Sequence, residues 1–205
     1  MYQLYYSPNA CSLATQVVLH ELDQQVSIID KRGVTDFSQI SPTGAVPALK
    51  DNEAVLLEGA AIMLHILKKQ ETPLFPDHPA KRTQATEDIL FANATMHPAY
   101  SKLFFVSALE IDDAAKQIAL QAAANSVNAL WEVVEQRLQK QMFLSGAHYS
   151  AADIMLTIYS RWNQYFSVDI VHGERTRELL ALITNLPSFQ RAIAAEAEHS
   201  ATYES

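Results

Sequence analysis

Short apolar runs separated by turn residues characterise the first 72 residues of the chain. Runs rich in aromatic and β-branched residues predict strands, and apolar positions spaced three and four apart predict helices. We expect strands at 2–6, 26–30, 46–50 and 54–57, the last two forming a hairpin, and helices at 11–22 and 58–69. The predicted order is therefore β-α-β-(irregular or α)-β-β-α, which indicates an α/β domain.

Apolar positions at helical spacing dominate the rest of the chain, where almost nothing resembles a strand. We expect helices at 81–109, 113–140, 150–162, 175–184 and 188–198. Between the two halves, Pro73, Pro76 and Pro79 predict a stiff connector. The pattern thus predicts an α/β domain at 1–75, a linker at 76–82 and an all-helical domain at 83–205.

Composition narrows the class of protein. The 205 residues include 15 Lys+Arg and 23 Asp+Glu, for a net charge of −8. Nucleic-acid binding needs clustered cations, so we expect no nucleic-acid partner. We expect no signal peptide, because the first residues have no positive region and no apolar stretch. We expect no membrane association, because the longest uncharged stretches are too polar for a span and no basic amphipathic helix is present. Cys11 is the only cysteine, so no intrachain disulfide can form, and we expect a cytoplasmic protein.

Cys11 is the first candidate for chemistry. It lies at the expected start of the first helix, where free backbone N–H groups and the helix dipole would lower the thiol pKa from its usual value of ~8.5. Tyr6 ends the preceding strand, and its hydroxyl could donate to a sulfur or a carboxylate. The alternatives are a small buried hydrophobe at Cys11 and a packing aromatic at Tyr6.

Two further features lie next to the predicted hairpin. Pro47 at the front of a strand is tolerable if the Val46–Pro47 peptide bond is cis, which would free the Val46 N–H and C=O to pair with an extended peptide. Glu58 and Gly59 open a helix whose N–H groups could bind a carboxylate, while Glu58 could accept from an ammonium group. A plain helix cap is the alternative for this pair.

Three residues of the second half stand out. His97 is followed by Pro98 inside a predicted helix, which predicts a kink; a packed histidine near that kink is the alternative. The other histidines have no ligand-like spacing, so we expect no metal site. Ser150 and Asp153 form a capping box with Asp in place of Glu or Gln, for which we expect a structural role in starting the helix at 150–162.

Taken together, four segments resemble the soluble glutathione transferases, most closely the bacterial beta class. They are Tyr5–Leu13 (YYSPNACSL), Ser41–Leu49 (SPTGAVPAL), Leu57–Met63 (LEGAAIM) and Leu144–Ile154 (LSGAHYSAADI). These segments occur in the family's order and spacing over nearly the whole chain. The resemblance implies a thioredoxin-like α/β amino-terminal domain, an all-α carboxy-terminal domain and a homodimer.

The resemblance also implies a glutathione site. Val46, before a cis Pro47, would pair with the cysteinyl backbone of glutathione. Glu58 and Gly59 would hold the γ-glutamyl end. Lys31 and Arg32 are the nearest basic candidates for the glycyl carboxylate.

Around the glutathione sulfur, the resemblance implies roles for Tyr6, Cys11 and His97, although Pro98 stands where the family often has Lys. We expect Phe104, Phe105 and Tyr159 of the helical domain to supply an apolar half of the cleft, and Trp162 to belong to the core.

The implied activity is conjugation of the glutathione thiolate to small hydrophobic electrophiles, without a metal. A mixed disulfide between Cys11 and glutathione would instead give thiol–disulfide exchange or peroxidase chemistry. A glutathione-dependent isomerase, dehalogenase or ring-cleavage enzyme is a further alternative. So is a non-catalytic binding protein, because one fold hosts many functions.

Overall fold

The structure is a computed structural model that describes residues 1–203. The chain divides into two compact units: unit 1 comprises Met1–Asp77 and Ile183–Ser205, and unit 2 comprises His78–Leu182. The division after residue 77 falls inside the expected linker at 76–82. The grouping differs from the expected helical domain at 83–205, because the last helix packs against elements of the α/β unit rather than belonging to unit 2.

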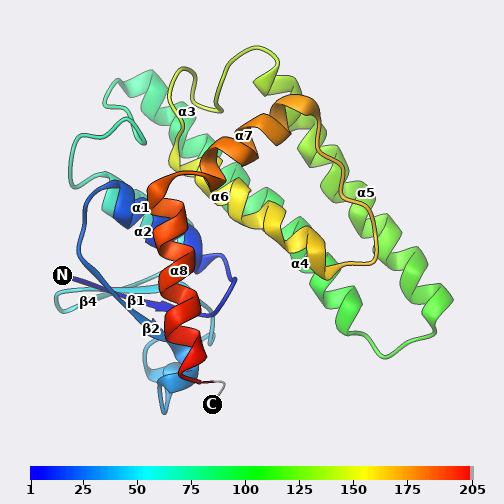
Figure 1. Ribbon diagram of the computed structural model, residues 1–205, viewed down its shortest axis with the longest axis horizontal. Helices are drawn as coiled ribbons and strands as arrows, with labels where there is room; N and C mark the ends of the chain where they lie inside the picture. Colours follow the sequence, from blue (N-terminus) through cyan, green and yellow to red (C-terminus); the bar gives the residue numbers. More distant parts are fainter. Residues whose placement is uncertain (204–205) are drawn as a thin grey trace. The chain divides into compact units, whose positions relative to one another are not determined.

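Unit 1 is built on a four-stranded sheet in the order β2-β1-β3-β4 (Figure 1). Its elements are β1 (Tyr2–Tyr6), α1 (Ser12–Glu21), β2 (Val26–Asp30), the short 3₁₀ turns η1 (Lys31–Gly33) and η2 (Phe37–Gln39), β3 (Ala48–Asp51), β4 (Ala54–Leu57), α2 (Gly59–Leu67) and α8 (Pro187–Ala201). β1 and β2 are parallel, β3 is antiparallel to β1, and β3 and β4 form the expected hairpin. This mixed sheet with its β-α-β and β-β-α halves confirms the thioredoxin-like prediction.

The central strand β1 is buried along most of its length, as is typical of a sheet covered on both faces. Leu4 and Tyr6 point to one face and are fully buried, and Tyr5 on the other face is 9% exposed. From α1, Leu13 and Val17 add buried side chains to the core. Figure 1 shows α8 lying beside α1 and β2, so the end of the chain completes this unit.

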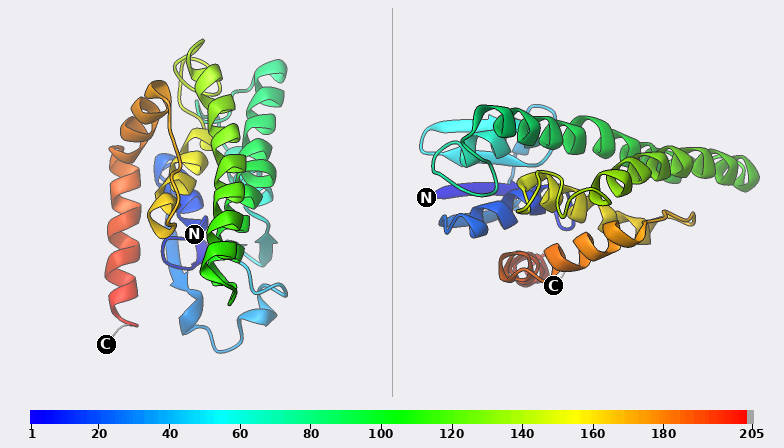
Figure 2. Two further views of the ribbon diagram at one scale, coloured as in Figure 1. Left: turned by 90° about the vertical axis from the view of Figure 1, so that its right-hand side faces the viewer. Right: turned by 90° about the horizontal axis from the view of Figure 1, so that it is seen from above.

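Unit 2 consists of helices, as expected. They are α3 (Pro79–Leu90), the π-helical turn η3 (Phe91–Met96), α4 (His97–Ala108), α5 (Asp113–Leu138), α6 (Ala151–Ser160), the 3₁₀ turn η4 (Arg161–Tyr165) and α7 (Glu174–Thr184), whose last two residues belong to unit 1. The views of Figures 1 and 2 agree that α4 and α5 run side by side.

The single helix predicted at 81–109 is interrupted immediately before His97 and Pro98. Pro98 has no N–H to donate to the carbonyl four residues earlier. In a π turn such as η3, each carbonyl accepts from the N–H five residues further along. The carbonyl that Pro98 cannot serve can therefore accept from the residue after the proline. The predicted irregularity at Pro98 therefore takes the form of a π turn between two α-helices.

The predicted capping box at the start of α6 is confirmed. The Ser150 hydroxyl accepts from the Asp153 amide, and the Asp153 carboxylate accepts from the Ser150 amide at 2.8 Å and its hydroxyl at 2.7 Å. The other carboxylate oxygen accepts from the Leu144 amide at 3.1 Å. Asp153 is fully buried, and burial raises its pKa to about 6. Within residues 1–203, no helix is long and apolar enough to cross a membrane.

Candidate functional site

Cys11 lies at the start of α1, as expected, and its thiol donates to the Val46 carbonyl oxygen across 3.5 Å. The side chain keeps some exposure to solvent. Burial nevertheless raises the thiol pKa to about 11, against the opposing effect of the Cys11 and Ser12 amides. The prediction of a lowered pKa is wrong for this structure, because the helix start does not offset the cost of taking a thiolate out of water.

The Val46–Pro47 peptide bond is cis, which confirms that expectation. Two hydrogen bonds fold the loop before it: Gly44 N–H to the Ser41 carbonyl at 2.8 Å, and the Ser41 hydroxyl to the Ala45 carbonyl at 2.9 Å. Gly44 has a φ of +68°, which suits a residue without Cβ. The loop thus brings the Val46 backbone to the Cys11 sulfur.

Glu58 and Gly59 mark the start of α2, as expected. Glu58 has a φ of +69° and a ψ of 115°. A non-glycine residue in this region is uncommon and costs about 1–3 kcal/mol; such strain clusters at ligand sites. Glu58 is exposed and Gly59 begins the helix, so a carboxylate acceptor and free helix amides lie side by side in the chain.

The two basic candidates of η1 have different surroundings. Lys31 keeps partial exposure and donates to the Gly44 carbonyl at 3.2 Å. Arg32 makes a bidentate pair with the buried carboxylate of Asp30, with its Nη2 atom 2.7 Å from Oδ2 and its Nε atom 3.1 Å from Oδ1. Lys31 is therefore the more available cation for a ligand.

Tyr6 contacts the carboxy-terminal helix. Its ring is fully buried, its hydroxyl lies 3.0 Å from His199 Nδ1 and 3.4 Å from Ser200 Oγ, and burial raises its pKa. Sequence reasoning missed these partners, which stand 193 and 194 positions away along the chain. A polar face on the last helix, at positions 196, 199 and 200, was the one signal that could have indicated them.

His97 belongs to unit 2 and begins α4. Its ring meets Tyr159 and Trp162 edge-on, at centroid distances of 5.2 and 5.3 Å. Ser101 Oγ lies 3.4 Å from His97 Nδ1. Burial lowers the pKa of His97, so the ring is neutral at pH 7 and keeps one nitrogen as an acceptor.

An aromatic cluster surrounds His97; its other members are Tyr100, Phe104, Tyr159, Trp162, Tyr165 and Phe166. Tyr159 is buried and stacks on Trp162, which is also buried, as expected for core. Phe104 is 41% exposed and presents the cluster to solvent. Phe105 is 67% exposed, so of the three residues expected to line an apolar surface, the two phenylalanines are accessible and Tyr159 is buried.

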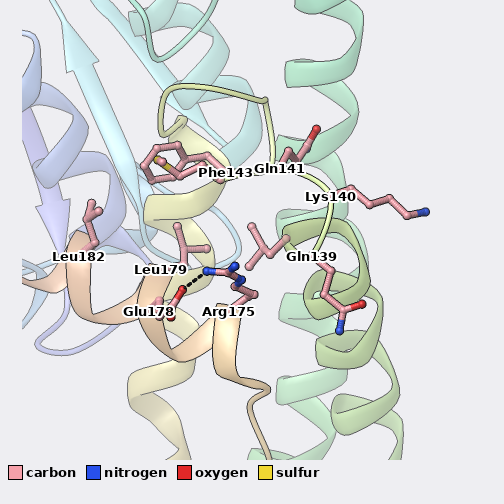
Figure 3. Close-up of a pocket in the computed structure, with 10 residues that line it drawn as sticks. Gln139, Lys140, Gln141, Phe143, Arg175, Glu178, Leu179 and Leu182 are labelled. Carbon is pink, nitrogen blue, oxygen red and sulfur yellow. Dashed lines mark hydrogen bonds and ion pairs between the residues drawn. The ribbon is translucent and has the colours of Figure 1, made fainter.

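A separate cavity of about 470 Å³ opens elsewhere in unit 2, between the end of α5, the loop that follows and α7 (Figure 3). Its buried apolar side chains are Leu138, Phe143 and Leu179, and the Arg175–Glu178 ion pair, at 2.8 Å, lies beside them. None of the predicted site residues lines this cavity. Across the part of the chain that the structure describes, no group of His, Cys, Asp and Glu is arranged to hold a metal ion.

Comparisons with known proteins place these features in context. A family model described as "Glutathione S-transferase, N-terminal domain" matches residues 1–74. Glutathione S-transferase GST-4.5 of Xanthomonas campestris is 32% identical over 174 residues, which cover 82% of this chain and 85% of the relative.

Two solved structures resemble the whole chain. The beta class glutathione S-transferase of Sphingomonas chungbukensis has a TM-score of 0.82 and 26% identity, covering 95% of this chain and 98% of its own. A sphingomonad glutathione S-transferase solved with glutathione has the same TM-score, 27% identity and the same coverage. The similarity therefore extends over both units.

Proposed function

The chain belongs to the glutathione transferase family and is a transferase with glutathione as its thiol substrate, and we propose that unit 1 binds this glutathione at three places. They are the segment 7–11 between β1 and α1, which we call the Cys11 loop, Val46–Pro47 and Glu58–Gly59. One observation carries the proposal: the Cys11 thiol lies 3.5 Å from the Val46 carbonyl. The start of α1 and the cis-proline segment, which are distant in sequence, thus meet at one place where a peptide thiol can be held.

The chemistry of each residue suits one part of the tripeptide. The Val46 backbone pairs with the cysteinyl residue as an added strand would. Amides at the start of α2, from Gly59 onward, bind the γ-glutamyl carboxylate, and Glu58 accepts from its ammonium group. Lys31 pairs with the glycyl carboxylate. Because the chain has a net charge of −8, these local donors must hold the anionic substrate against the overall charge.

The protonation state of the Cys11 side chain favours conjugation over disulfide exchange. With a pKa of about 11, the side chain is almost entirely thiol at neutral pH. Exchange requires the thiolate, whereas a thiol can donate a hydrogen bond to the glutathione sulfur. We therefore assign Cys11 the role of a donor that stabilises the glutathione thiolate, and the exchange or peroxidase activity becomes the second candidate.

In unit 2, we propose His97 as the residue that assists the chemistry and the aromatic cluster as the surface for a hydrophobic electrophile. The neutral His97 ring can accept a proton, and the partly exposed Phe104 supplies apolar area. A homodimer, membership of the beta class and a cytoplasmic location complete the proposal. The structural similarity to a bacterial beta class enzyme supports the class, and the single free thiol supports a cytoplasmic location.

The test combines calorimetric binding of glutathione with turnover of a chloronitrobenzene. We expect saturable binding and turnover by the parent, a loss of about tenfold in kcat for Cys11→Ala, and partial recovery in Cys11→Ser, which restores a donor. A Cys11→Ser variant as inactive as Cys11→Ala would contradict the donor role. His97→Ala tests the second residue in the same assay.

Intact mass spectrometry separates the two candidates. A reductant-labile adduct of glutathione mass on freshly purified protein, absent from Cys11→Ser, would favour exchange chemistry over the donor role. Absence of glutathione binding by the parent would overturn the proposed site altogether.

A further inference from the structure

The end of the chain presents four side chains to the first two strands of unit 1. Glu196, His199 and Ser200 lie on one face of α8 because their spacing is three and four residues, and Tyr203 follows the helix. We call these four residues the C-terminal clamp. All four contact segments that flank the proposed glutathione residues.

At the end of β1, the clamp holds Tyr6. The Tyr6 hydroxyl contacts His199 Nδ1 at 3.0 Å and Ser200 Oγ at 3.4 Å, and the Tyr6 and His199 rings are 5.9 Å apart between centroids. Tyr6 is fully buried, so these contacts satisfy a phenol that has no access to water. They fix the point at which the chain leaves the sheet for the Cys11 loop.

Within that loop, the clamp holds Asn9. The Asn9 amide donates to Glu196 Oε2 at 3.1 Å, and Glu196 is only 5% exposed. Asn9 has a φ of +58°, in the left-handed region that asparagine adopts more readily than most residues. Because Asn9 stands two positions before Cys11, this bond constrains the path of the backbone to the sulfur.

At the end of β2, the clamp holds the segment that carries Lys31. Arg32 pairs with the fully buried Asp30, and its guanidinium carbon lies 5.3 Å from the centroid of the Tyr203 ring. A Cβ at Gly33 would lie 2.1 Å from the Tyr203 hydroxyl, so any larger residue at this position would displace the Tyr203 ring. Asp30 is also the register partner of Tyr6 in the sheet, so the clamp contacts at the ends of β1 and β2 are neighbours.

We propose that the C-terminal clamp positions both glutathione-binding segments, the Cys11 loop and Lys31, and that Tyr6 acts by anchoring the clamp rather than by touching the sulfur. Glu196, His199, Ser200 and Tyr203 are then positioning residues for substrate binding. This inference rests on the proposed glutathione site. It predicts that loss of a clamp contact raises the KM for glutathione while kcat stays within about twofold, because binding geometry changes and the reacting groups do not.

The first test uses Tyr203, which is 41% exposed and not part of the buried core. We expect Tyr203→Ala to raise the KM for glutathione about three- to tenfold, and Tyr203→Phe, which keeps a ring over Arg32, to restore most of the loss. Thermal unfolding of both variants records stability in parallel. An unchanged KM in Tyr203→Ala would overturn the role of this residue.

The second test separates anchoring from catalysis at Tyr6. We expect Tyr6→Phe, which removes only the hydroxyl, to raise the KM for glutathione and to leave kcat and its pH profile unchanged. Tyr5→Phe, the same change one residue earlier in β1, is the matched control and should match the parent. A fall in kcat of tenfold or more in Tyr6→Phe, with a shifted pH profile, would show that the hydroxyl serves the sulfur and would refute the anchoring role.

Measurements on the parent protein distinguish a failure of the proposed glutathione site from a failure of the clamp inference. If the parent does not bind glutathione in the calorimeter, the proposed site fails and the clamp has no substrate to position. If the parent binds and turns over, but Tyr203→Ala and Tyr6→Phe keep its KM, the site stands and the clamp inference alone is refuted.

Discussion

Asp30 in unit 1 and Asp153 in unit 2 are both fully removed from solvent, and their pKa values move in opposite directions. Burial acts to raise the pKa of Asp30, but hydrogen bonds from the Arg32 side chain and amide, together with its charge, outweigh it and lower the pKa. Burial raises the pKa of Asp153 to about 6; hydrogen bonds from Ser150 and Leu144 oppose this rise only in part, and the charge of Asp88 adds to it. Of these two buried carboxylates, the one paired with a cation has the lowered pKa, so burial alone does not decide the direction of the shift.

Of the changes that test this difference between the two carboxylates, Asp153→Ala should have the largest effect on the free energy of unfolding. The change leaves the Ser150 amide, its hydroxyl and the Leu144 amide without their acceptor inside unit 2. We expect a loss of about 2–4 kcal/mol in the free energy of unfolding, measured with urea. Ser150→Ala, which removes the reciprocal half of the box, should cost about 1 kcal/mol. Equal losses in the two variants would contradict the central role of the carboxylate.

A smaller effect should follow when Asp30 loses its cation. Arg32→Met keeps the aliphatic stem but leaves the buried carboxylate of Asp30 unpaired. We therefore expect the Asp30 pKa to rise, as burial raises that of Asp153. Because the Arg32 side chain is 41% exposed, we expect a cost of about 1–2 kcal/mol rather than the larger penalty of a fully buried pair. Arg32→Lys is the control that retains charge, and it should recover part of the loss. Unfolding curves at pH 7 provide the measurement.

The smallest effect is a difference in pH dependence. The Asp153 pKa of about 6 in the folded protein exceeds the ordinary aspartate value of 3.8, so the folded state binds the proton more tightly. Its contribution to stability therefore falls as pH rises from about 4 to about 6 and is constant above. Asp30 has the opposite sign: its lowered pKa gives stability that is present above pH 4 and is lost on further acidification. Asp153→Asn should remove the decline between pH 4 and 6, and a variant whose curve parallels that of the parent would rule this out.

Local patterns were sufficient for much of the fold. The strands at 2–6, 26–30 and 54–57 have the predicted bounds, because alternation and turn residues define a strand within a few positions. The capping box at Ser150 and Asp153 was likewise legible, since its two partners are three residues apart. The helix predicted at 81–109 was only partly right, because a proline indicates an interruption but not whether a π turn absorbs it.

Properties that depend on distant segments were not predictable in this way. The rise in the Cys11 pKa arises from the atoms that surround the thiol, not from its place at a helix start. The partners of Tyr6 lie at the opposite end of the chain, and nothing near Tyr6 in sequence indicates them. The resemblance supplied the candidate residues for the site, whereas their charge states and hydrogen-bond partners required the three-dimensional arrangement.

The return of α8 to unit 1 has a consequence for synthesis on the ribosome. The first 77 residues emerge before unit 2, yet their layer against α1 and β2 arrives only when residues 187–201 have been translated. Unit 2 is complete earlier, although it begins later. The amino-terminal part of the chain must therefore wait for residues 187–201 before this face is covered, and a premature stop ahead of them would leave the oldest part of the nascent protein unfinished.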